Sequence, residues 1–170
     1  MLMKRVLFSS VLFLALTLSS FATTVERLTL DDMVHKAHAI VHGRVRSSVA
    51  QWSVDHRLIV TTTTIDIQET LKGQAARTIQ LTTIGGQVGG LTLVVPGMPS
   101  FDAGEDAVVF IENVGTAKAV VGLSQGKFSV RNGRVSNATS GLSFPDGRPA
   151  DLPVSMGLED FKRQIRNRMK

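Results

Sequence analysis

The stretch RLIVTTTTIDIQETLKG, residues 57–73, decides the fold class of this chain. It is crowded with the β-branched residues Ile, Val and Thr, which are enriched in strands because they pack well on a pleated surface. Six side chains are expected on one buried face: Ile59, Thr61, Thr63, Ile65, Ile67 and Leu71. Because strand side chains point to opposite faces in turn, the stretch predicts one long strand, which Lys72 and Gly73 end.

Segments on both sides of this stretch also have strand character. In residues 40–45, Val41 and Val45 alternate with His42, which predicts a strand with one polar face. Residues 107–112 are apolar almost without a break, as in a strand that is covered on both faces. The chain is therefore expected to form a sheet in which some strands are half-exposed and at least one is fully buried.

Further strands and two helices complete the predicted fold. Alternating segments lie at residues 78–84 and 91–95, and Asn132-Gly133 between two valines is a hairpin signal. A short helix is expected over Asp31–Ala37, begun by a Thr29–Asp32 capping box. The fold class is mainly β: six to eight short strands in a small antiparallel OB-like barrel or curled sheet, with a helix at each end.

The helix expected near the C-terminus, residues 155–170, is amphipathic. Its apolar stripe is narrow and consists of Leu158, Phe161, Ile165 and Met169. We expect this stripe to pack on the sheet while the surrounding cations, Lys162 among them, stay in water. The alternative is a helix that leaves the sheet and binds an anionic membrane or another polyanion.

The first 22 residues have the layout of a secretory signal peptide. Lys4 and Arg5 precede an apolar run that is too short to span a bilayer, and a small-x-small motif ends at Ala22. Cleavage after Ala22 predicts an exported protein, periplasmic or extracellular, without a transmembrane anchor. Residues 23–170 then form a single domain whose stability must come from its core, because the chain has no cysteine and hence no disulfide.

The composition limits the classes of partner. The formal charge of +5 includes two residues of the leader, so the mature chain carries only about +3. One Trp and no Tyr supply little surface for stacking on bases or sugars, and nucleic acid is not an expected partner.

The glycine-rich stretch TIGGQVGGLT, residues 83–92, is interpreted as a turn between strands. A phosphate-binding loop needs Lys followed by Ser or Thr and then a helix, but Leu91 stands in the lysine position and a strand is expected after it. The four glycines of the run, Gly85, Gly86, Gly89 and Gly90, are expected to let the sheet bend.

The stretch GLSQG, residues 122–126, matches the spacing of a hydrolase nucleophile. It lacks the helix that should follow and any downstream histidine, so Ser124 is expected in a hairpin and not in catalysis. No catalytic residue and no cofactor is predicted.

Three histidines are the weak candidates for a metal site. His35, His38 and His42 would share a face if one helix held them all. The β-branched residues after His38 instead predict that His42 lies on a strand, so solvated or packed histidines are expected. The acidic residues of FDAGED, residues 101–106, lack the spacing of a calcium loop and are interpreted as a turn.

The pattern AHAIVHGRV, TTTTIDIQETLKG, IQLTTIGG and FDAGEDAVVFIE resembles exported bacterial β-barrel proteins of uncharacterised function. More distantly it resembles the netrin-like modules and the tissue inhibitors of metalloproteinases, which use an OB-type barrel. The resemblance covers about residues 35–112 and implies architecture. The matching positions are taken as structural: Gly43, Lys72, Gly73, Gly104, Glu105 and Phe110. The zinc-binding N-terminal cysteine of those inhibitors has no counterpart in this cysteine-free chain.

These observations favour an exported, non-catalytic module that binds a protein or an envelope component through its loops. The loops expected to carry the binding are the glycine turn, residues 85–90, and the segment Pro96–Asp102, because a rigid sheet holds both. The alternatives left open are a histidine-based metal protein or metalloenzyme, and polyanion or anionic-membrane binding through the basic C-terminal helix.

Overall fold

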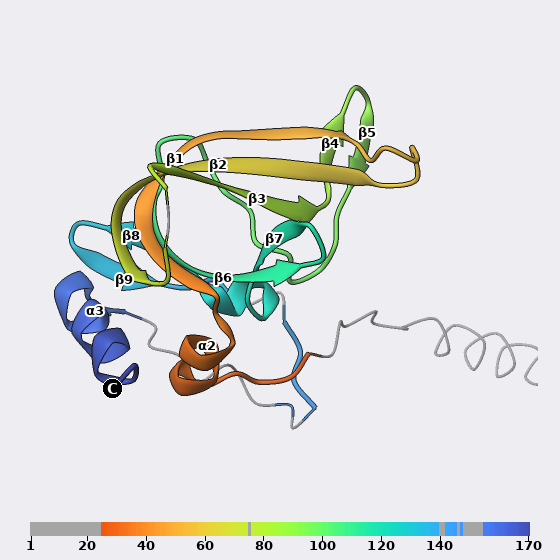
Figure 1. Cartoon of the computed structure of the whole chain (residues 1–170). Helices are drawn as coiled ribbons and strands as arrows, with labels where there is room; N and C mark the ends of the chain where they lie inside the picture. The colour runs from red at the N-terminus through yellow and green to blue at the C-terminus, as the bar shows by residue number, and fades with distance from the viewer. Residues whose placement is uncertain (1–24, 75, 140–141, 146, 148–154) are drawn as a thin grey trace, which may run out of the picture.

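A computed structural model describes residues 25–74, 76–139, 142–145, 147 and 155–170 (Figure 1). The signal peptide and its cleavage point lie outside the described residues. The elements in chain order are α2 (Leu30–Lys36), β1 (Ala39–Trp52), β2 (Ile59–Lys72), β3 (Thr78–Ile84), β4 (Gly86–Val88), β5 (Leu91–Leu93), β6 (Asp106–Val114), β7 (Ala117–Val120), the 3-10 helix η1 (Leu123–Gly126), β8 (Lys127–Arg131), β9 (Arg134–Ser136), β10 (Met156–Gly157) and α3 (Leu158–Asn167). The chain is mainly β with two α-helices, as the alternating sequence patterns predicted.

The main sheet is antiparallel and strongly curled. Its strand order is β10-β9-β8-β6-β1-β2-β3, β7 pairs with the other part of β6, and β4 and β5 form a separate hairpin. The long strands β1 and β2 bend so that β3 approaches β7 (Figure 1). No strand pairing joins β3 to β7 in the described residues, so the sheet is not closed into a barrel.

Two bulges in β2 correct one prediction about its buried face. The register with β1 shifts between Ile40 and Val41 and again between His42 and Gly43, where β2 contributes extra residues. Each extra residue reverses the alternation. Ile65 and Ile67 therefore pack on the concave side of the sheet, whereas Leu71 joins the core under the helices.

Each side of the central strands has its own core. The concave side buries Val41, Ile65, Leu81 and Val109, among others. The helix side is centred on the rings of Phe110, Phe128 and Phe161, and the last two have centroids 4.5 Å apart.

Strand β6 runs between the two cores. Ala107–Ile111 is fully buried, which confirms the prediction of a strand covered on both faces. The polar face expected for residues 40–45 is wrong at its start, because Ile40 and His42 are also buried, beneath the helices.

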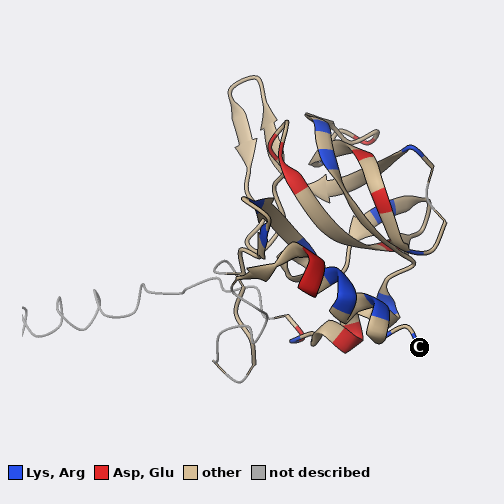
Figure 2. Cartoon of the chain, turned by 90° about the vertical axis from the view of Figure 1, so that its left-hand side faces the viewer, with Lys and Arg blue, Asp and Glu red and all other residues tan. Residues whose placement is uncertain are grey.

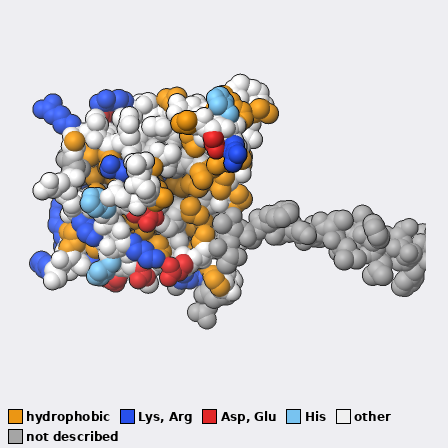
Figure 3. Space-filling view, turned by 45° about the vertical axis from the view of Figure 1, so that its right-hand side comes forward, with side chains coloured by type: hydrophobic (Ala, Val, Ile, Leu, Met, Phe, Trp, Pro, Cys, Tyr) orange, Lys and Arg blue, Asp and Glu red, His pale blue; other side chains and the backbone are white. Residues whose placement is uncertain are grey.

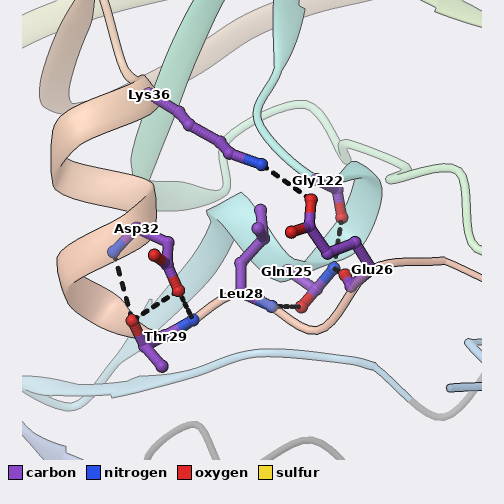
Figure 4. A network of polar contacts seen from close by, with 7 residues as sticks. All are labelled: Glu26, Leu28, Thr29, Asp32, Lys36, Gly122 and Gln125. Carbon is purple, nitrogen blue, oxygen red and sulfur yellow. Dashed lines mark hydrogen bonds and ion pairs between the residues drawn. The ribbon is translucent and has the colours of Figure 1, made fainter. Parts of the chain in front are cut away.

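Helix α2 begins with the predicted capping box. The Thr29 hydroxyl accepts from the Asp32 amide, and the Asp32 carboxylate accepts from the Thr29 amide (Figure 4). The segment before the helix is held by the fully buried Gln125, whose side chain accepts from the Leu28 amide and donates to the Glu26 carbonyl. Because these bonds join the segment before α2 to η1, they hold that segment in place beside the sheet.

Helix α3 is shorter than the predicted helix over residues 155–170. It begins at Leu158, because Met156 and Gly157 pair with β9. Phe161 and Ile165 are fully buried on the sheet, whereas Met169 is exposed. None of the helices in the described part of the chain is long and apolar enough to cross a membrane.

Candidate functional site

A cavity of about 460 Å³ lies at the end of the molecule that carries the β4–β5 hairpin. Its floor is the concave face of β1, β2 and β3, and its walls are the hairpin and the loop Val94–Phe101. The two segments that the sequence predicted as binding loops therefore line one cavity. Its volume is within the range of ligand sites in proteins, about 300–1,000 Å³.

The floor of the cavity is made of hydroxyl groups. The concave face of β2 changes from Ile65 to Thr63 and Thr61, so the apolar core stops where the cavity begins. The Ser48 and Thr63 hydroxyls are 3.0 Å apart, and the Thr61 hydroxyl donates to the Gly85 carbonyl at 2.6 Å. These contacts hold the hydroxyls in place. Ser48 and Thr61 are partly exposed and keep oxygen lone pairs for a ligand, whereas Thr63 is fully buried.

The glycine run forms the hairpin that covers the cavity. Gly85 donates to the Ile59 carbonyl at 2.8 Å, and the strands on both sides of Gly89 and Gly90 pair with each other. A Cβ at Gly86 would lie 2.5 Å from the Thr61 hydroxyl oxygen, so only glycine permits this close approach. The amides are used in pairing and a strand follows, so the run lacks the geometry of a phosphate loop.

A partly buried ion pair anchors the loop that forms the other wall. The Lys127 ammonium lies 2.7 Å from Glu105 and donates to the Ser100 carbonyl at 2.8 Å. Ser129 also donates to the Glu105 carboxylate. Burial disfavours the charged form of Glu105, but the hydrogen bonds from Lys127 and Ser129 outweigh it and lower its pKa below the usual value. The loop is thus fixed at its base while Val94 and Met98 face the cavity.

The cavity offers binding groups but no acid or base. Among the described residues, those that line it include no Asp, Glu, His, Lys or Arg. General acid–base catalysis needs a titratable group within hydrogen-bond reach of the substrate. The lining suits the binding of an uncharged group.

The rim of the cavity is apolar at Ile84 and Val94, which line it and are exposed. Of the eight large hydrophobic side chains exposed in the described structure, five more belong to hairpins and strand ends at this end of the molecule: Val49, Val54, Leu58, Leu91 and Val114. The eighth, Met169, is next to the C-terminus, on the far side of the molecule (Figure 1). Figure 3 shows hydrophobic side chains gathered in the centre of the face toward the hairpins.

Charged residues are found on both helices and along several strands (Figure 2). Ion pairs lie at the β1–β2 turn, at the base of the Val94–Phe101 loop, and between α3 and the sheet. Arg44 pairs with Asp106 at 3.0 Å, and its hydrogen bond lowers the pKa of that carboxyl. Lys162 pairs with Glu69 at 2.7 Å and Arg166 pairs with the same carboxylate. Lys162 is only 5% exposed, which corrects the expectation that it stays in water. It is buried because Glu69 lies on the strand directly beneath the helix.

The histidines do not come together as a metal site. His35 lies on α2, with its Nδ1 2.8 Å from the Asp31 carbonyl, and His38 follows that helix. His42 lies on β1, as predicted, and His56 stacks on Trp52 at the β1–β2 turn. No group of three or more metal-binding side chains is found in the described residues.

Ser124 lies in a 3-10 turn and not in the expected hairpin. Gly122 and Leu123 before it adopt positive φ angles, which start the turn η1. Its hydroxyl is buried without a hydrogen-bond partner in the described structure, and β8 follows where a nucleophile elbow requires a helix. Lys127, three residues later, is held by Glu105.

Most residues to which the sequence assigned structural roles lie outside the cavity. The exceptions are the hairpin glycines Gly85 and Gly86, which line it. Gly43 contacts the Asp66 carbonyl too closely for a Cβ, and Gly73 adopts φ +76° at the end of β2. Lys72 donates to the Val34 carbonyl at the end of α2, Gly104 turns the chain into β6, and Phe110 fills the helix-side core. The cavity hydroxyls were missed, although Thr61 and Thr63 on a predicted buried face were a visible signal.

Comparison with protein-family models, curated proteins and solved structures found no match to this chain. The function must therefore be inferred from the geometry of the site.

Proposed function

We propose that this protein is an exported, non-catalytic module that binds a protein or an envelope component at the hydroxyl-lined cavity. The binding surface combines the cavity with its apolar rim. In this proposal the curled sheet is an OB-like barrel left open between β3 and β7, and the opening gives access to the interior. Export rests on the signal-peptide layout of residues 1–22.

The observation that carries the proposal is a cavity without charged lining residues, at the end of the molecule that also exposes apolar side chains. None of the described residues that line the cavity is charged, and seven of the eight large hydrophobic residues exposed in the described structure lie at this end. Exposed apolar surface that concentrates in one place usually marks an interaction site.

The lining also indicates the chemistry of the bound group. Burying a charge without a partner costs several kcal/mol. The partly exposed hydroxyls of Ser48 and Thr61, together with backbone carbonyls, supply hydrogen bonds to a neutral polar group. The rim residues Leu91 and Val94 then cover the apolar part of the partner.

The test uses charge substitutions at exposed sites on the two ends of the molecule. Residues 23–170 are immobilised, and bound material from the native exported fraction is compared for wild type, Leu91→Asp, Val94→Asp and Met169→Asp. We expect the first two variants to lose the bound component and Met169→Asp to retain it. Equal binding by all three variants, or loss with Met169→Asp alone, would place the interaction elsewhere and refute the proposal.

A further inference from the structure

Strand β3 is the edge of the main sheet, with β2 as its only hydrogen-bonded neighbour among the described strands. Two backbone hydrogen bonds, from the Gly85 amide to the Ile59 carbonyl and from the Ile67 amide to the Arg77 carbonyl, show which residues of β3 bond to β2. In an antiparallel pair every second residue exchanges bonds with its partner and the others face outward. The N–H and C=O groups of Thr82 and Ile84 therefore point away from β2.

A groove of about 440 Å³ lies along this free edge. On the far side of it is the β6–β7 hairpin, which contributes Val114, Ala117 and Ala119. Some Cα atoms of β3 and β7 come within 8 Å, yet no pairing joins them. Since β6 is the one described strand that pairs with β7, a modest outward shift of that hairpin would admit another strand.

The groove and the cavity meet at the edge of β3. Four residues line both: Thr83, Ile84, Met98 and Pro99. A strand added to this edge would point successive side chains to opposite faces of the sheet. One side chain would enter the hydroxyl-lined cavity, and the next would enter the groove beside Ile84 and Val114.

We propose that the partner is an extended peptide segment that adds to β3 as a further strand. Its backbone pairs with Thr82 and Ile84, and its side chains alternate between a small polar residue for the cavity and an apolar residue for the groove. Glu112 lines the groove and is the only charged residue among the described residues that line the two hollows. The cavity itself has none, so the side chain that enters the cavity is uncharged. This inference rests on the proposed function, because it specifies how the same end of the molecule binds.

Proline substitution tests the pairing directly. Proline removes an N–H group and is tolerated at an edge strand where that group faces outward. Thr82→Pro removes an outward N–H beside the cavity, and Thr78→Pro removes one at the other end of β3, away from both hollows. The two variants differ in position but not in chemistry. Ile84→Ser, which leaves the backbone groups intact, is a second variant if Thr82→Pro unfolds.

The probe is a phage-displayed library of random nonapeptides selected on residues 23–170. We expect the selection to enrich peptides with polar–apolar alternation. These peptides should bind Thr78→Pro as tightly as wild type, bind Thr82→Pro at least about tenfold more weakly, and bind Ile84→Ser about tenfold more weakly. Peptides that bind Thr82→Pro like wild type would overturn the strand pairing. If they still failed to bind Leu91→Asp, the proposed function would stand.

Two other results would also overturn the inference. Enrichment of no peptide from the library would show that β3 does not accept an extended segment. A dimer in sedimentation that dissociates in Thr82→Pro would show that a second copy of the chain occupies the edge.

Discussion

Substitution of Gly86 gives the clearest test of how the hairpin closes over the cavity. Gly86 has φ +129°, and a Cβ there would lie 2.5 Å from the Thr61 hydroxyl oxygen and 2.7 Å from the Ala50 methyl. Holding a non-glycine residue at such an angle costs about 1–3 kcal/mol. Forcing an atom into filled space costs about another 1–3 kcal/mol. Gly86→Ala should therefore lower the free energy of unfolding by about 2–6 kcal/mol.

Urea unfolding of residues 23–170 measures this loss, with the single tryptophan, Trp52, as the fluorescent probe. With a slope of about 1–3 kcal/mol per molar urea, the midpoint should fall by at least about 0.7 M. Gly90→Ala is the matched control, because a Cβ at Gly90 meets nothing within 4 Å, and its effect should stay within about 0.5 kcal/mol. Equal stability of Gly86→Ala and wild type would refute the close packing of the hairpin on β1 and β2.

Three further predictions concern charged and titratable groups. Burial and, to a smaller extent, the charge of Lys162 lower the pKa of His42 from 6.5, while the acidic groups Asp106, Glu69 and Glu159 oppose this. As the pH falls, the unfolded chain takes up the proton first, so the free energy of unfolding measured with urea should decrease below about pH 6.5. A His42→Gln variant whose pH dependence matched wild type would exclude His42 as the cause. Lys162→Met should lower the free energy of unfolding by about 1–2 kcal/mol at pH 7, because Glu69 loses a charged hydrogen bond. Lys162→Ala should lower it further, because the buried side-chain stem is lost as well. Thermal unfolding of the two variants measures this order. Glu105→Gln should lower the free energy of unfolding by about 1–3 kcal/mol at pH 7, since Lys127 loses its partner. It should also speed amide hydrogen exchange in the loop between Val94 and Phe101. Unchanged exchange would show that the ion pair does not anchor that loop.

Much of the fold could be predicted because local patterns and tertiary packing agree. The β-branched run of β2 forms a strand, the uninterrupted apolar run of β6 is buried on both faces, and the Thr29–Asp32 spacing caps α2. In each case the residues that favour the element locally also make its long-range contacts.

The failures occur where a distant part of the chain decides the outcome. Leu71 changes face because bulges against β1 shift its register, which no pattern within β2 reveals. Lys162 is buried because Glu69, far away in sequence, lies beneath it. Ser124 enters a 3-10 turn because Gly122 and Leu123 take positive φ angles.

The candidate site could be predicted in part. The loops were identified from their glycines and prolines, but their meeting over one cavity depends on the curl of the sheet. The inward threonines of β2 were visible in the sequence, yet which of them reaches the cavity follows only from the fold: Thr61 stays partly exposed, whereas Thr63 is fully buried.

Photo-cross-linking from two positions tests the central claim most directly. A benzophenone side chain is placed at Leu91, on the hairpin beside the cavity, or at Met169, on the far side, and the variants are irradiated in the native exported fraction. If the end of the molecule that carries the cavity is the binding surface, the Leu91 position yields a discrete cross-linked product and the Met169 position yields none. A product from Met169 alone, or none from either position, would contradict the account.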